Sequence, residues 1–225
     1  MKLLFIRHGA PDYIKDCLTE KGTAQAERLA ERLKDEHITA AYMSPMGRAK
    51  ETAHICLDGT GIPLTECAWL HEFDVSVHGL NGDILPWDLE PECRRDGRIF
   101  DREGFDLSDT ARGTDMKARY LAVSEGLDSV LAAHGLIKDG DMYVKQGVCG
   151  DTLAFFCHFG ATCVMIAKLL GISPVLTLQG MSCEPTAIAV MCTDDRFGNR
   201  VNFRLHSYGD INHLEDRQES GINYK

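Results

Sequence analysis

Apolar runs and amphipathic helical patterns alternate along the first part of the chain, and this alternation constrains the fold more than any other feature. Residues 1–6 (MKLLFI) and 38–44 (ITAAYMS) have the short apolar character of buried strands. Between them, residues 18–36 predict a helix whose apolar face holds Ala26, Leu29, Ala30 and Leu33. Strands that alternate with helices are typical of a parallel α/β sheet.

A second helix is predicted over residues 44–59, directly after the second strand. Ser44 would be its N-cap, Pro45 would take its first helical position, and Gly59 would lie near its end. Its buried face would contain small and apolar side chains at helical spacing, namely Ala49, Thr52, Ala53 and Cys56.

The later part of the chain returns to the same pattern. A helix is predicted over residues 115–134, a strong strand over 151–158 and a further helix over 160–171. Residues 186–194 and 200–209 have the pattern of two last strands, which could pair around the turn between them. We therefore predict the α/β class, with three α/β/α layers and a mostly parallel central sheet.

Residues 73–114 break this pattern, since they are rich in Gly, Pro, Asp and Arg and too long for a simple connection. We interpret them as an insertion or lid, with short helices of its own, within a single domain over residues 1–225. Trp87 could cover a pocket or belong to a small core of the insertion. The insertion's arginines could bind a second anionic group of a substrate, but intervening acidic residues favour a solvated, salt-bridged surface for Arg94, Arg95, Arg98 and Arg102.

Charge and composition exclude several classes of protein. The net charge of −10 argues against a general nucleic-acid or anionic-membrane binder, because both partners would repel the average surface. No run is long enough to span a membrane, and the apolar start is too short for a signal peptide. The polar tail, residues 215–225, is expected to be loose.

Cysteine usage indicates a reducing compartment. The nine cysteines are odd in number, form no CxxC pair and lie partly in apolar segments, at Cys56, Cys157, Cys163 and Cys192. No cluster of cysteine and histidine has the spacing of zinc ligands. A cytoplasmic protein with no metal and no cofactor is the expectation from these features.

Charged groups follow several of the predicted strands at the point where each strand ends. Arg7 and His8 follow the first strand, Arg48 lies just beyond the second, and His158 follows the strand at 151–158. Carboxyl ends of parallel strands lie along one sheet edge, so these side chains could converge there, with Glu72 as a candidate carboxylate. Arginine forks suit phosphate oxygens, a neutral imidazole can attack phosphorus, and a carboxylic acid can protonate a leaving oxygen.

At these residues the sequence resembles the histidine phosphatase superfamily, in its phosphoglycerate-mutase-like branch. The matching motifs run in the family's order over nearly the whole chain: RHG at 7–9, LTEKGTAQA at 18–26, SPMGRAKETA at 44–53, LHEF at 70–73, CHFG at 157–160 and INHL at 211–214.

The resemblance implies a role for each matched residue. His8 corresponds to the nucleophile that becomes phosphohistidine, and Arg7 and Arg48 correspond to the arginines that hold the phosphoryl oxygens. His158 matches the second histidine, which donates a hydrogen bond to the phosphate and stabilises the transferring group. Glu72 matches the general acid, which later acts as the base for water. The family needs no metal, because cationic side chains supply the charge.

The sequence also departs from the family's pattern. RHG is followed by Ala10, Pro11, Asp12 and Tyr13 rather than by the usual Glu-Thr-x-x-Asn type of stretch. Phe159 separates the second histidine from Gly160, and Asp74 is a rival to Glu72 as the acid.

We expect a metal-independent phosphomonoester hydrolase that acts through phosphohistidine on a small phosphorylated metabolite. The alternatives are a phosphoglycerate-type mutase and a catalytically weak, phosphate-binding regulatory protein. The Glu-Arg-x-Tyr-Gly stretch of glycolytic mutases is missing, and the nucleophile and both arginines are present, so hydrolysis is preferred. The identity of the phosphomonoester and the oligomeric state stay open.

Overall fold

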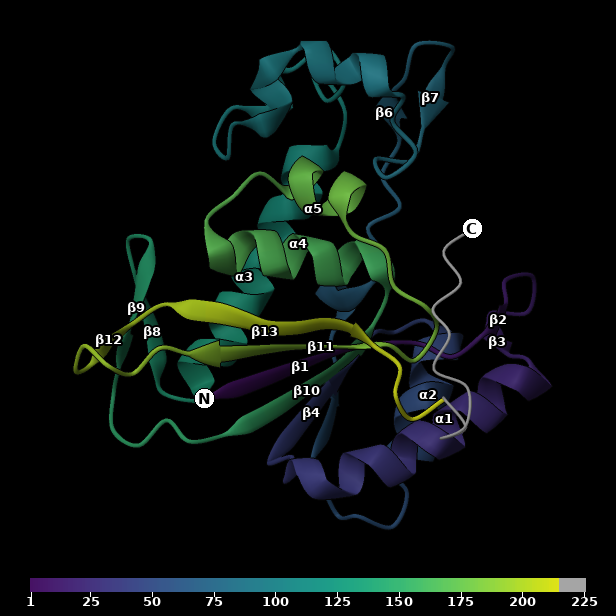
Figure 1. Cartoon of the computed structure of the whole chain (residues 1–225), viewed down its shortest axis with the longest axis vertical. Helices are drawn as coiled ribbons and strands as arrows, with labels where there is room; N and C mark the ends of the chain where they lie inside the picture. The colour runs from purple at the N-terminus through teal and green to yellow at the C-terminus, as the bar shows by residue number, and fades with distance from the viewer. Residues whose placement is uncertain (215–225) are drawn as a thin grey trace.

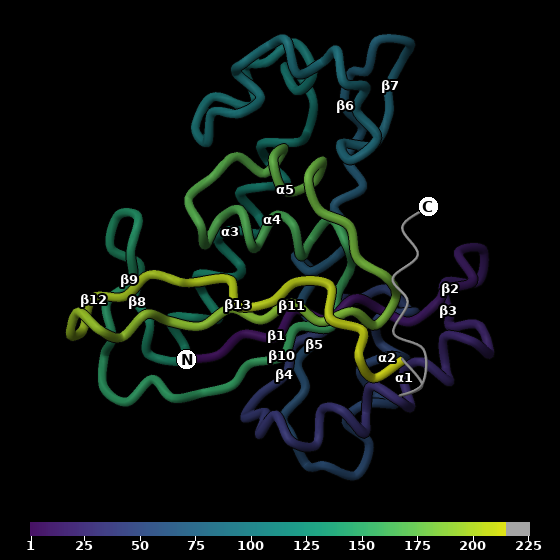
Figure 2. Tube along the Cα trace, in the orientation of Figure 1, coloured from purple at the N-terminus to yellow at the C-terminus, as the bar shows by residue number. Residues whose placement is uncertain are grey.

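The computed structural model describes residues 1–214, and the expectation for the polar tail lies outside them. Its centre is a six-stranded sheet in the order β13-β11-β1-β10-β4-β5 (Figures 1 and 2). The strands are β1 (Lys2–Arg7), β4 (Ala40–Met43), β5 (Leu64–Glu66), β10 (Thr152–Cys157), β11 (Ile188–Thr193) and β13 (Phe203–Asp210). β1, β10, β4 and β5 pair in parallel, whereas β11 and β13 pair antiparallel at the other side. The predicted mostly parallel sheet and the pairing of the last two strands are confirmed.

Helices cover both faces of the sheet, which confirms the three layers (Figure 1). In β1, Leu4 and Ile6 face α1 (Glu20–Leu33) and α2 (Gly47–Leu57). Leu3 and Phe5 alternate with them and face α3 (Met116–Ala133) and α4 (Phe159–Leu170) on the other side. All of these strand side chains are at most 1% exposed, so β1 is a central strand buried on both faces.

The long helices form where the apolar pattern predicts them: α1, α2 and α3 each bury one face, and α4 is buried on nearly all sides. Thr19 caps α1 by accepting a hydrogen bond from the Gly22 amide, and Gly171 ends α4 in the left-handed conformation at φ 68°. The predicted inner face of α2 is buried throughout. In the helix predicted over residues 115–134, the apolar pattern is carried by side chains that are all buried in α3, namely Tyr120, Val123, Leu127, Val130 and Leu131.

The predicted start of α2 is wrong. The helix begins at Gly47, with Met46 as its N-cap residue, so Pro45 lies before the helix and Ser44 is not the cap. The Gly47 amide is capped instead by the Asp16 carboxylate, at 2.7 Å from the amide nitrogen to Oδ2. Ser44 is fully buried at the end of β4 and has a different partner, described below.

Several short elements have no counterpart in the sequence prediction. They are the hairpin of β2 (Pro11–Asp12) and β3 (Cys17–Leu18), β5, the hairpin of β8 (Leu136–Asp139) and β9 (Met142–Lys145), and α5 (Pro174–Gly180). β12 (Arg200–Val201), which pairs with β9, falls within the predicted strand at 200–209. Two-residue and four-residue strands are too short to give a clear period in a sequence.

Residues 73–114 contain β6 (Val77–His78), β7 (Asp83–Ile84) and the 3₁₀ helices η3 (Pro91–Arg95), η4 (Gly97–Phe100) and η5 (Phe105–Leu107). The expected short helices are therefore present. The segment lies beyond α4 and α5 as seen from the sheet (Figure 1). The Ser173 hydroxyl donates to the Ile99 carbonyl at 2.5 Å, and the buried Phe73, Ile99 and Phe105 join the core that α3 and α4 form.

All nine cysteines are free, and Cys56, Cys157 and Cys163 are buried in the core while Cys192 is half-buried. Within residues 1–214, no helix has the length and apolarity needed to cross a membrane. The same described residues contain no group of three or more His, Cys, Asp or Glu side chains that could hold a metal ion.

Candidate active site

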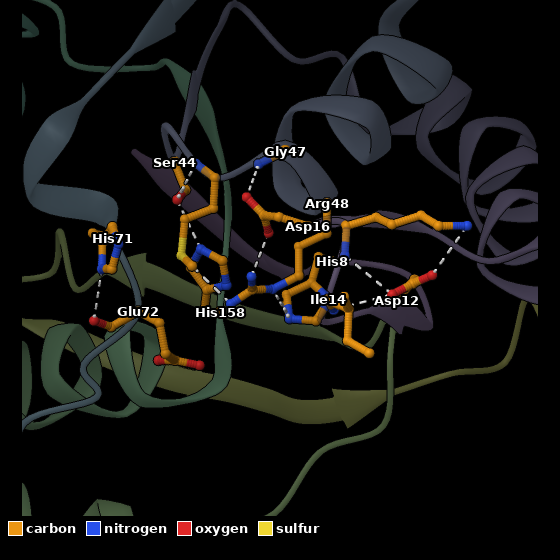
Figure 3. Close-up of polar contacts among 12 residues, drawn as sticks. His8, Asp12, Ile14, Asp16, Ser44, Gly47, Arg48, His71, Glu72 and His158 are labelled. Atoms are coloured by element: carbon orange, nitrogen blue, oxygen red, sulfur yellow. Dashed lines mark hydrogen bonds and ion pairs between the residues drawn. The ribbon is translucent and has the colours of Figure 1, made fainter.

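The sheet brings the predicted site residues together at one edge (Figure 3). β1 ends at Arg7 and is followed by His8, and its neighbour β10 ends at Cys157 and is followed by His158. Arg48 lies in the first turn of α2, after β4. Glu72 follows β5 through the 3₁₀ helix η2 (Ala68–Leu70). Parallel pairing places these strand ends at one edge, which is why residues far apart in sequence meet there.

His8 is 1% exposed, and both of its ring nitrogens have a partner. Nδ1 donates to the Gly9 carbonyl at 2.8 Å, and Nε2 accepts from Nε of Arg48 at 3.2 Å. Burial lowers the pKa of His8 to about 4, and the charges of Arg48 and Arg7 act in the same direction. The imidazole is therefore neutral at physiological pH, with its lone pair on Nε2.

Gly9 allows the chain to turn tightly after His8. A Cβ atom at this position would lie 2.6 Å from the Gly22 carbonyl oxygen in the first turn of α1, which is closer than any real side chain approaches. The Gly9 amide also donates to the Thr52 hydroxyl of α2 at 3.0 Å. Both helices on this face thus hold the loop that carries the nucleophile candidate.

Arg48 is 5% exposed and is held mainly by the β2–β3 hairpin. Its Nη1 forms an ion pair with Asp16 at 2.5 Å, and its guanidinium lies 5.4 Å from the centre of the Tyr13 ring. Asp16 has a φ of 51°, in the left-handed region, so the turn aims its carboxylate at both Arg48 and the amide of Gly47. The residues that replace the usual stretch after RHG therefore orient one of the site's arginines.

Arg7 donates from Nη1 to the Cys183 carbonyl. Its Nε is buried and has no hydrogen-bond partner within residues 1–214. The backbone of the same strand end is fixed by Thr186, whose amide donates to the carbonyls of Arg7 and His8, each at 3.1 Å. Arg7 is thus anchored at one end of its guanidinium and has donor capacity left over.

His158 is fully buried beside His8, with the two ring centroids 5.1 Å apart. Its Nε2 lies 2.7 Å from the hydroxyl oxygen of Ser44, which itself accepts from the Met46 amide at 3.2 Å. Burial, aided by His8 and Arg48, lowers the pKa of His158 far below its usual range, so the ring is neutral. We assign the Ser44 hydrogen to His158 Nε2, which leaves the proton on Nδ1, a buried atom without a partner among the described residues.

Glu72 reaches the N-terminus of α4. Its Oε1 accepts from the amides of Phe73 at 2.7 Å, Gly160 at 2.9 Å and Ala161 at 3.3 Å. Burial raises the pKa of Glu72 and outweighs these hydrogen bonds and the charge of Arg7, which lower it. The side chain is therefore biased toward the protonated carboxylic acid.

Asp74 differs from Glu72 in every respect that matters for an acid. Its side chain is 52% exposed, and its Oδ1 lies 3.8 Å from Nδ1 of His71. Both carboxyl groups border the same cavity, but only Glu72 is buried against a helix N-terminus.

A cavity of about 550 Å³ opens at this edge of the sheet. Its walls come from β1, the β2–β3 hairpin, the start of α2, residues 72–87, the start of α4 and the segment before β11. The lining residues are Arg7, Tyr13, Met46, Arg48, Glu72, Asp74, Leu85, Trp87, Phe159, Ser182 and Cys183. Trp87 belongs to this wall and packs edge-on against Phe159, with ring centroids 5.7 Å apart.

The insertion's arginines do not line this cavity. Arg98 pairs with Asp96 and Asp109, and Arg102 pairs with Glu103 and Asp141. The expectation of a salt-bridged surface is confirmed for these two residues.

Three residues of the site were not singled out for it by the sequence. Ser44 had been interpreted as a helix cap, Asp16 lies outside the matching motifs, and Gly160 was noted only as the residue after Phe159. The sequence feature that could have assigned Ser44 to the site is its place directly after an apolar strand. His8 and His158 follow their strands in the same way.

The sheet topology defines an α/β protein that brings two histidines and two arginines together at the carboxyl edge of its sheet. A family model described as the histidine phosphatase superfamily (branch 1) matches residues 3–134, and the chain belongs to that superfamily.

Curated relatives match about half of the chain. Proteins named "Probable phosphoglycerate mutase GpmB" are 32% identical in Citrobacter koseri and 34% identical in an Enterobacter species, each over 127 residues. Each match covers 53% of this chain and 58% of the relative, so the chain spans little more than half the length of these relatives.

Solved structures share the fold over almost the whole chain. A mutant phosphoserine phosphatase from Entamoeba histolytica, in complex with phosphoserine, has a TM-score of 0.63 at 19% identity and covers 95% of this chain and 99% of its own. YhfR from Bacillus stearothermophilus has the same TM-score at 23% identity, with the same coverage.

Proposed function

We propose that the protein is a phosphomonoesterase that hydrolyses a small phosphorylated metabolite through a phosphohistidine at His8, without a metal ion. The observation that carries the proposal is the geometry at one cavity, where Nε2 of the buried His8 faces the Arg48 guanidinium and the buried Glu72 carboxyl lies at the N-terminus of α4. His8 is held neutral, with a lone pair on Nε2, and Glu72 is held toward its acid form. One group is prepared to attack and the other to give a proton.

The phosphoryl group would bind between Arg7, Arg48 and His158. Arg48 covers Nε2 of His8 in the structure, so the arriving phosphate must draw the Arg48 guanidinium onto its own oxygens before Nε2 can attack. The Nδ1 proton of His158 and the unpartnered Nε of Arg7 supply further donors. These groups stabilise the charge on the equatorial oxygens as the phosphoryl group moves.

In the first step the Nε2 lone pair of His8 forms the N–P bond, and the P–O bond to the alcohol breaks. The departing oxygen keeps the electron pair and takes the proton of Glu72. In the second step a water oxygen attacks phosphorus while the Glu72 carboxylate accepts a proton from that water. The N–P electrons return to His8, which restores both groups.

The relatives' names support the class of substrate. They include phosphoserine phosphatase and probable phosphoglycerate mutase, whose substrates are small phosphate esters. Free cysteines throughout the chain support a cytoplasmic location. We also take residues 73–114 as a lid over the site within one domain, because Leu85 and Trp87 line the cavity.

Phosphate release from a panel of phosphomonoesters, with EDTA present, tests the proposal. Wild type should release phosphate, and His8→Ala should lose the activity, whereas His54→Ala on the exposed side of α2 should keep it. A quenched reaction should contain phosphoenzyme that is labile to acid and stable to base, as phosphohistidine is. Transfer of phosphate between two positions of one substrate without release would instead favour a mutase. Neither release nor phosphoenzyme would favour a regulatory phosphate-binding protein.

A further inference from the structure

We infer that the cavity next to the phosphoryl position takes an apolar, ring-bearing alcohol and disfavours substrates that carry a second negative charge. This inference rests on the proposed function, because it names the leaving group of that reaction.

The cavity wall away from the arginines is largely apolar. Trp87 and Phe159 meet edge to face, and Tyr13, Met46 and Leu85 complete the wall. Tyr13, at the mouth of the cavity, has 66% of its surface exposed, and the Arg48 guanidinium lies 5.4 Å from the centre of its ring. Flat aromatic surfaces of this kind bury a planar group well, and they offer few partners to a strongly hydrated one.

The charges at the cavity are balanced before any substrate binds. Within residues 1–214, the cations that line it are Arg7 and Arg48, both beside His8. Asp16 is ion-paired with Arg48, and Asp74 lines the cavity directly, so two positive charges face two negative ones. A phosphate monoester brings a further charge of about −1.5 to −2 at pH 7, and the two arginines must neutralise it. A second anionic group would meet Asp74 rather than a cation.

Two further arginines, Arg119 and Arg94, make their contacts outside the cavity. Arg119 donates from Nη2 to the backbone carbonyl of Glu72 at 2.9 Å and borders a separate depression that also contains Asp83 and Asp115. The guanidinium of Arg94 lies over the ring of Phe100 at 5.1 Å. Either arginine would have to break its contact to bind a carboxylate in the cavity.

The consequence is a preference within pairs of matched substrates. Phenyl phosphate should be a better substrate than 4-carboxyphenyl phosphate, and glycerol 3-phosphate a better one than 3-phosphoglycerate. Each pair differs mainly by one negative charge. Repulsion between like charges a few ångströms apart in a partly solvated cavity corresponds to a ratio in kcat/KM of roughly tenfold.

Steady-state kinetics on both pairs, with the full chain, test the inference. Wild type should show the tenfold preference, and Asp74→Asn should reduce it several-fold by removing the facing charge. Asp83→Asn is the matched control, since it removes the same charge from the same segment at a residue that does not line the cavity. Trp87→Ala should lower kcat/KM more for phenyl phosphate than for glycerol 3-phosphate, because only the former uses the ring.

Binding to the His8→Ala variant separates this inference from the proposed function. Calorimetry should show tighter binding of phenyl phosphate than of 4-carboxyphenyl phosphate. Hydrolysis without a preference, or with a preference for the carboxylates, overturns the inference and leaves the hydrolase intact. Preferential binding without any hydrolysis supports the inference and overturns the hydrolase. The absence of both binding and hydrolysis overturns both.

Discussion

A carboxyl group that is buried and biased toward its acid form, as Glu72 is, matters most when the leaving group is a poor one. Glu72→Gln should lower kcat for alkyl phosphates by about 10²–10³, because an alkoxide must then leave without a proton. The loss should be much smaller for 4-nitrophenyl phosphate, whose phenolate is stable unprotonated. Glu66→Gln, an exposed change on β5, is the control. Equal losses for both kinds of ester would assign Glu72 another role.

The dependence of kcat/KM on pH should follow the same two side chains. His8 must be unprotonated to attack, so activity should fall as pH drops through its pKa of about 4. Glu72 must be protonated, so activity should fall again as pH rises through its pKa, which burial raises above the usual value. A pH profile measured for wild type and Glu72→Gln with one substrate checks this. The variant should lose the alkaline limb and keep the acid one.

Ser44 should behave as a positioning residue for His158. Ser44→Ala removes the hydroxyl that bonds His158 Nε2 and leaves a buried nitrogen unpaired, which should destabilise the fold by about 1–2 kcal/mol. Activity should fall through kcat, since His158 can then turn. Ser173→Ala removes another buried hydroxyl, bonded to the Ile99 carbonyl, and should lower stability without the loss in kcat. Similar kcat values in the two variants would contradict this role.

The residues of the site could be located from the sequence through the strands that precede them and through the motifs that resemble the family. Arg7, His8 and His158 follow long apolar runs, so their position at a sheet edge was predictable. The bond between Ser44 and His158 joins residues 114 positions apart, and no local pattern reports such a contact. Serine before proline is also a common helix start, and that local signal led to the wrong cap.

At the level of single elements, the first turn of α4 has room only for glycine at position 160, directly after Phe159. A Cβ on Gly160 would lie 2.8 Å from Oε1 of Glu72 and 2.8 Å from Cζ3 of Trp87. Gly160→Ala should therefore displace the Glu72 carboxyl and lower kcat for alkyl phosphates at least about tenfold, although alanine favours the helix itself. Kinetics and thermal melting of the variant check this. Gly180→Ala in α5, where a Cβ meets nothing within 4 Å, should leave kcat unchanged.

Long helices and central strands were the elements that the sequence predicted well. α1 and α3 each bury a regular stripe, and β1 and β10 are apolar on both faces, so their patterns are strong. The start of α2 and the β2–β3 hairpin were not predictable, because they depend on each other. Asp16 in the hairpin caps Gly47 of the helix, so the helix start is set by a residue outside it.

On the scale of the whole molecule, the buried histidines should make the fold sensitive to acid. An unfolded chain binds protons at His8 near pH 6.5, whereas the folded chain does not until about pH 4. Stability should therefore decrease as pH falls through this window, by roughly 3 kcal/mol for His8 alone. Urea unfolding between pH 7 and pH 4 should show a shallower dependence on pH for His8→Ala. His206→Ala, at an exposed position, should keep the wild-type dependence.

The three layers and the mostly parallel sheet followed from the alternation of strands and helices. The order of the strands did not, because sequence patterns do not state which strands are neighbours. β1 lies between β10 and β11, both made more than a hundred residues later.

That strand order has a consequence during synthesis. β1 leaves the ribosome before β10 and β11, yet Lys2 pairs with Thr152 on one side and with Cys192 on the other. At about 5–20 residues per second, β1 waits roughly 8 to 30 seconds before β10 is made. During that time both edges of this apolar strand are unpaired. An unpaired strand can pair with a wrong segment or bind a chaperone. The segment that will carry the nucleophile is thus the part of the nascent chain most in need of protection.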